Sequence, residues 1–145
     1  MSQWTTEIYI KPYLKDFLMG QFGDEPIKFP RGCDIINRIV RLTDKQPIKL
    51  QSRKYNIKIL LPYNNLKDPR IYNYLSENSQ KIIERYVKYL FNEILHEHIM
   101  RNKRDMLIHG SIYNFFEIYE INMDNITPDG LKKKYYRFIK KFKKI

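Results

Sequence analysis

The chain has 145 residues, the length of one ordinary domain, and 43% of them are hydrophobic, enough to bury a core. Wholesale disorder is therefore excluded, and the single cysteine, Cys33, excludes an internal disulfide and a cysteine-based zinc site. The formal net charge is +11. The first residues lack the pattern of a signal peptide, and no uncharged apolar run approaches about 18 residues, so we expect a cytoplasmic protein with no membrane partner.

Residues 1–65 predict a small α/β part made of short strands and two helices. Proline suits the first turn of a helix, and glycine commonly follows its last turn. Pro62 ends the clearest apolar strand. In chain order we expect a strand at Glu7–Ile10, a helix that begins at Pro12 and is ended by Gly20 and Gly23, and an extended piece at Ile27–Phe29. A second helix at Asp34–Leu42 and a strand at Ile57–Leu61 follow. The strands would form one small sheet with the two helices on it.

A turn-rich stretch, Asn64–Tyr74, separates this part from a helical part over residues 76–145. The first of three predicted helices starts at an N-cap, Ser79, and has a stripe of eight large apolar residues from Ile82 to Leu95. The other two are Arg104–Ile121 and a helix that follows the N-cap Thr127, with Pro128 in its first position. The predicted fold is therefore helix-dominated α+β.

The last helix concentrates the positive charge of the chain. From Leu131 to Ile145 there are eight basic residues and no acidic ones, whereas the rest of the chain has 19 basic and 16 acidic residues. At 100° per residue the apolar side chains fall on one face: Leu131, Tyr135, Phe138, Ile139 and Phe142. The residues that we expect to contact nucleic acid are Lys132, Lys133, Tyr136, Arg137, Lys140, Lys141 and Lys144.

The order of the last two helices is that of a helix-turn-helix, in which the later helix enters the major groove. Like charges on one helical face repel one another, and a polyanion relieves that repulsion. We therefore predict a protein that binds duplex DNA through its last helix. Part of the stripe from Ile82 to Leu95 would face a second copy, because one small neighbour does not cover eight large residues.

Three other interpretations stay open. A lysine-rich last helix is also an ordinary solvated face, although such a face usually mixes both signs of charge. A structural component of a virion would use the same helix on protein or packaged genome. A binder of RNA or single strands would use a second set of basic and aromatic residues. This set is Arg31, Arg38, Arg41, Arg53, Lys54 and Arg70 with Tyr55, Tyr72 and Tyr74. We favour the interpretation that these residues are ordinary surface charge on a mixed fold.

The sequence does not predict an enzyme. It has no glycine-rich phosphate loop, no paired catalytic carboxylates and no nucleophile motif. Glu93 and His96 are spaced like one half of a di-metal site, but the second half is missing. His96 and His98 lie about 200° apart on a continuous helix, so they do not share an ion. We expect no metal, no cofactor and no small-molecule substrate.

Three segments resemble small helix-turn-helix-like proteins of gut-bacterial phages and mobile elements. These proteins share a Tyr-x-x-x-Tyr-Leu start, a Lys-Asp-Pro-Arg-x-Tyr-Asn-Tyr-Leu block and a closing helix rich in Lys, Tyr and Arg. The corresponding segments here are Tyr9–Leu14, Lys67–Leu75 and the helix Lys132–Lys141. The resemblance carries no assigned activity. It implies a phage or mobile-element context. Together with the basic helix, this context leads us to expect a regulator or replication accessory in the host cytoplasm.

Overall fold

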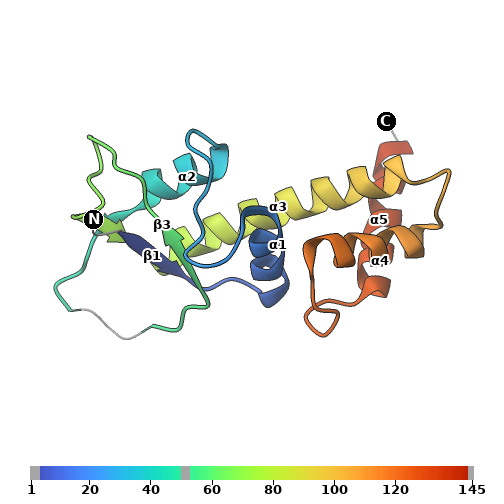
Figure 1. Cartoon of the computed structure of the whole chain (residues 1–145), viewed down its shortest axis with the longest axis horizontal. Coiled ribbons are helices and arrows are strands. Elements are labelled where there is room, and N and C mark those ends of the chain that lie inside the picture. The colour runs from blue at the N-terminus through green and yellow to red at the C-terminus, as the bar shows by residue number, and fades with distance from the viewer. Residues whose placement is uncertain (1–3, 50–52, 144–145) are drawn as a thin grey trace.

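The computed structural model describes residues 4–49 and 53–143, and within them the fold is helix-dominated α+β. The helices are α1 (Pro12–Phe22), α2 (Asp34–Leu42), α3 (Glu77–Arg101), α4 (Ile108–Tyr119) and α5 (Pro128–Lys143). The strands are β1 (Thr5–Ile8), β2 (Asp44–Lys45), β3 (Ile57–Leu60) and β4 (Tyr72–Tyr74). In Figure 1 the long helix α3 spans the molecule, with the strands and α2 toward one end and α4 and α5 toward the other.

The strands form two small antiparallel pairs; the first joins strands that the sequence predicted, and the second was not predicted. β1 pairs with β3 so that Ile8 lies opposite Ile57, and β2 pairs with β4. Ile27, in the predicted extended piece, joins the first pair through a parallel bridge to Ile59. Ile57 and Ile59 are buried, because alternate residues of a strand share one face. This face covers one end of the core.

The first two helices lie close to their predicted ranges. α2 has the predicted bounds, and α1 begins at Pro12. α1 passes through Gly20 and ends at Gly23, whose φ of 106° is in the region that favours glycine. A Cβ atom on Gly20 would lie 2.3 Å from the backbone oxygen of Tyr119. Gly20 therefore permits the close approach of α1 to α4 and does not end the helix.

The ends of the later helices follow their caps. α3 begins earlier than predicted because Ser76, not Ser79, is the N-cap, and its side chain accepts a hydrogen bond from the Ser79 backbone nitrogen at 3.1 Å. α4 begins later than predicted, after a turn in which the Asn102 carbonyl oxygen accepts from the backbone of Met106 at 2.8 Å. α5 begins as predicted, with the Thr127 hydroxyl accepting from the Gly130 nitrogen at 3.2 Å.

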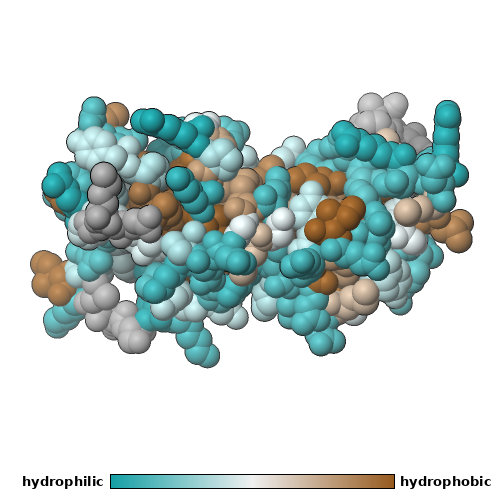
Figure 2. Space-filling model, viewed as in Figure 1, coloured by the Kyte–Doolittle hydropathy of each residue, from teal (hydrophilic) through white to brown (hydrophobic). Residues whose placement is uncertain are grey.

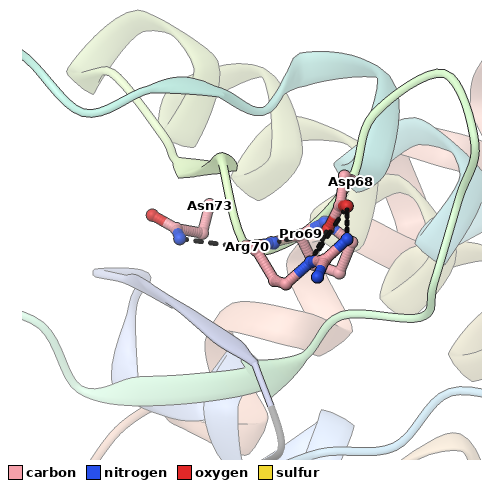
Figure 3. Close-up of polar contacts among 4 residues, drawn as sticks. All are labelled: Asp68, Pro69, Arg70 and Asn73. Atoms are coloured by element: carbon pink, nitrogen blue, oxygen red, sulfur yellow. Dashed lines mark hydrogen bonds and ion pairs between the residues drawn. The ribbon is translucent and has the colours of Figure 1, made fainter.

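The segment 67–74 folds into a compact turn that is fastened to α2. The Asp68 carboxylate accepts hydrogen bonds from the guanidinium and the backbone nitrogen of Arg70, and Asn73 donates to the Pro69 carbonyl oxygen (Figure 3). The Lys67 ammonium donates to the carbonyl oxygens of Arg41 and Thr43 at 2.7 and 2.6 Å. These carbonyls lie at the C-terminal end of α2, where helical partners are lacking. The turn thus holds β4 against β2.

One core joins the two parts of the chain. Phe17 of α1 packs against Phe91 of α3 and Phe115 of α4, with ring centroids 5.3 and 6.5 Å apart. The buried cluster continues from Ile8 in β1 to Tyr135 in α5. The predicted division into residues 1–65 and 76–145 therefore separates a mixed α/β part from a helical part, and both parts share this core. As a division into domains it stays a prediction.

Replacing Gly20 by alanine is expected to reduce the free energy of unfolding by about 1–3 kcal/mol, because the added Cβ meets the Tyr119 backbone. Gly110→Ala is the matched control. Its nearest heavy atom outside the local backbone, in Met106, is 4.0 Å away, and alanine favours a helix over glycine by about 0.5–1 kcal/mol. Urea denaturation measures both variants. Equal effects of the two substitutions would contradict the close packing of α1 on α4.

Candidate nucleic-acid interface

α5 is anchored to the rest of the protein by its apolar face. Leu131 and Tyr135 are buried, and Phe138 and Ile139 are partly buried against the core. Figure 1 shows α5 crossing the far part of α3, beside α4. Apolar spacing in the last two helices predicts that they meet at Phe115, Phe116, Leu131, Tyr135 and Phe138. In the structure Phe138 is half-buried and the other four side chains are buried. The side chain of Phe142 lies outside the described residues.

The opposite face of α5 is open to solvent. Most of the predicted contact residues are exposed: Lys133, Tyr136, Arg137, Lys140 and Lys141. Lys132 is half-buried at the edge of this face, and Lys144 lies outside the described residues. In Figure 2 hydrophilic residues cover most of the surface near the end of α5. We call the five exposed residues the α5 basic face.

The basic side chains of this helix have no acidic partners in the described part of the chain. None of the lysines from Lys132 to Lys141, nor Arg137, makes an ion pair there. The acidic residue of the helix, Asp129, lies in its first turn, and its carboxylate is 4.0 Å from His109. The α5 basic face is therefore positive without local compensation, which favours an external anion.

The sequence did not predict that the positive region extends beyond α5. Lys134 is half-buried, and burial lowers its pKa, with further lowering by the nearby charges of Lys88, Lys11 and Arg137. Lys88 belongs to α3, and Lys11 precedes α1. Nothing in their sequence neighbourhoods indicates this meeting, because it depends on how three helices pack. Glu84 is also close, and its carboxylate accepts a hydrogen bond from the Lys11 backbone nitrogen at 3.0 Å.

His96 connects α3 to α5. Its ring centroid lies 5.7 Å from that of Tyr135 and 4.4 Å from that of Phe138. Its Nε2 atom is buried and has no hydrogen-bond partner among the described residues. Burial lowers the pKa of His96, and the nearby charge of Glu93 opposes this shift only in part. His96 thus acts as an uncharged packing ring at neutral pH.

The other histidines and carboxylates do not gather around a common point. The His98 ring lies 3.0 Å from the amide oxygen of Asn114, which joins α3 to α4. Across residues 4–49 and 53–143, no three side chains of His, Cys, Asp or Glu are placed to hold a metal ion. Over the same ranges, no helix combines the length and the apolar run that crossing a bilayer requires.

The second predicted basic and aromatic set is largely paired within the chain. Arg38 lies over the ring of Tyr86 at 4.2 Å, and Arg53 lies over Tyr74 at 4.3 Å. Arg70 is held by Asp68. These contacts occupy three of the six cations, so the set as a whole does not form one open surface for stacking on bases. Arg31 and Arg41 are exposed and are not paired in this way within the described residues.

The stripe on α3 that we expected to face a second copy is used mainly inside the chain. Four of its eight residues are buried in the core: Ile83, Val87, Phe91 and Leu95. Three more are partly buried against it, and Ile82 is exposed. α1, α2 and α4 all pack on this helix, which explains why so large a stripe is needed. A homodimer stays a prediction, and this stripe offers it little area.

Comparison with known protein families, curated proteins and solved structures finds no match to this chain. The function is therefore inferred from the geometry and charge of the residues themselves.

The burial of His96 predicts a pH dependence. The unfolded chain takes up a proton near the ordinary pKa of about 6.5, whereas the folded chain takes it up only at lower pH. His96 therefore costs no stability above about pH 6.5, and below it the free energy of unfolding falls as the pH decreases. The variant His96→Phe keeps a ring against Tyr135 and Phe138. We expect its melting temperature to fall less than that of the native chain when the pH is lowered from 7.5 to 5. The control is His109→Gln, and an equal loss in all three proteins would refute a role for His96.

Proposed function

We propose that this chain binds duplex DNA through the α5 basic face. The observation that carries the proposal is the separation of the two faces of α5. One face is fixed in the core by Leu131 and Tyr135, and the other exposes cations without ionic partners among the described residues. A helix held in this way presents its charges in a fixed arrangement, which a free basic tail does not. Fixed cations along a helix suit the regular phosphates of a duplex.

The exposed residues supply the contacts that a duplex requires. The ammonium groups of Lys133, Lys140 and Lys141 neutralise phosphates, and each contact releases a bound counterion. Arg137 also has the planar group that pairs with a guanine edge in the major groove. Tyr136, 46% exposed, donates a hydrogen bond to a phosphate oxygen. No metal, cofactor or small substrate takes part in this mechanism.

The helix-turn-helix arrangement belongs to the same proposal. α4 and α5 have the order of that motif, and α5 would be the helix in the groove. Their connection, Glu120–Thr127, is longer than the turn of three or four residues that is usual there. In the phage or mobile-element context that the resemblance implies, a duplex-binding protein of this kind would be a regulator or a replication accessory. A regulator of this size would bind as a homodimer, because one such helix contacts few base pairs.

The triple substitution of Lys133, Arg137 and Lys140 by glutamine tests this proposal. Log affinity for a duplex should fall linearly with log salt concentration, with a slope of about −0.9 per neutralised phosphate. In the triple variant the slope should be shallower by roughly 2 to 3. Fluorescence anisotropy with a labelled duplex at several salt concentrations measures both slopes.

The matched control removes the same charge elsewhere. Lys49, Lys103 and Arg104 are exposed and lie outside α5, so their substitution by glutamine should change the slope much less. Equal changes in the two variants would mean that DNA senses only the overall charge of the protein. An unchanged slope in the α5 variant would remove this helix from the interface.

A further inference from the structure

A second cationic surface lies beside α2, separate from α5. Two adjoining hollows, of about 550 and 320 Å³, share Asn37, Pro62 and Asn64 in their walls. We call the joined hollows the α2 trough. α2 lies toward the opposite end of the long axis from α5 (Figure 1). The two surfaces therefore do not belong to one binding site.

The α2 trough is positive along its length. Lys28 and Arg31 line the larger hollow, and Arg41 and Lys67 line the smaller one. No aspartate or glutamate is among the described residues that form these walls. The charged groups of Lys28, Arg31 and Arg41 make no ion pair within the described ranges. Lys67 donates to carbonyl oxygens, which leave its charge in place. A positive concavity of this kind concentrates a polyanion.

The trough also offers an open aromatic ring. Tyr63 lines the larger hollow and is 69% exposed. Among the described residues no other ring contacts it and no cation lies over its face, and Arg70 is near enough to interact with its hydroxyl charge. Tyr74 and Tyr86, in contrast, are each covered by an arginine. Tyr63 is therefore placed to stack on a planar group that enters the trough.

Two amides in the shared wall have hydrogen-bonding capacity left. The Asn37 Nδ2 atom donates to the Gly32 carbonyl oxygen at 3.3 Å, which leaves its Oδ1 to accept. The Asn64 Oδ1 atom accepts from the backbone nitrogens of Leu66 and Lys67, which leaves its Nδ2 to donate. An acceptor and a donor in the same wall are the groups that the edge of a nucleobase requires.

We propose that the α2 trough binds single-stranded nucleic acid. The cations neutralise phosphates, Tyr63 stacks on one base, and the two amides bind the edge of a base. A duplex does not fit this chemistry, because its base faces are already stacked on one another. The proposal stands independently of DNA binding by α5.

The test uses the full chain with Lys133, Arg137 and Lys140 changed to glutamine, so that α5 contributes little. The probes are labelled oligomers of dT and of rU, about 12 nucleotides long. Tyr63→Ala should weaken binding by about 5- to 100-fold, because it removes one stacked base. Tyr63→Phe keeps the ring and should stay within about twofold. Comparison of the two oligomers tells DNA from RNA.

The matched control is Tyr89→Ala, which removes an exposed tyrosine of α3 that belongs neither to the α2 trough nor to α5, and it should leave the affinity for both oligomers unchanged. Lys28→Gln combined with Arg31→Gln should make the salt dependence shallower by roughly 1.4, since each single-strand phosphate contributes about 0.7. Tyr63 is exposed, so its loss leaves the fold intact, which circular dichroism checks. Unchanged affinity for both oligomers in Tyr63→Ala would overturn the proposal. So would equally tight binding of thymidine monophosphate, which would make the ligand a nucleotide.

Discussion

The contact of Phe17 with the rings of α3 and α4 is the constraint on which the rest of the structure depends. Phe17 lies 5.3 Å from Phe91 and 5.4 Å from Tyr119, and Phe91 lies 5.7 Å from Phe115, all measured between ring centroids. Aromatic pairs at these separations add about 0.5–1.5 kcal/mol each to the burial of their area. They bring α1 onto α3 and α4, and Gly20 permits this approach. α4 in turn positions α5.

Two opposing free energies decide whether α5 keeps its basic face. Like charges four residues apart, such as Lys133 with Arg137, disfavour a helix by about 0.2–0.5 kcal/mol per pair. Burying one large side chain such as Leu131 contributes about 1.5–3 kcal/mol. Anchoring therefore outweighs the repulsion, and the helix stays formed with its charge unrelieved. An anion that binds there relieves the repulsion between the cations, and this relief adds to its affinity. Salt screens the repulsion and therefore reduces this contribution.

Sequence patterns predicted the elements with strong periodicity or clear caps. α2 and the start of α5 were placed correctly because apolar spacing and the Thr127–Pro128 pair are local signals. The pair of β2 and β4 was missed, since short polar strands of this kind form only where a partner lies beside them. The positions of Lys11 and Lys88 near Lys134 were also missed, because only the packing of helices brings them together. Tyr63 lies just before the turn-rich stretch, and only the fold brings it to the wall of the α2 trough.

Lysine footprinting of α5 is the most direct test of the central claim, that an anchored helix presents its outward face to duplex DNA. The protein would be reductively methylated with and without a saturating duplex, and each lysine would be quantified by mass spectrometry. We predict that Lys133, Lys140 and Lys141 lose reactivity with the duplex, while exposed Lys49 and Lys103 keep theirs. Unchanged reactivity along α5, or an equal loss at every lysine, would contradict the account.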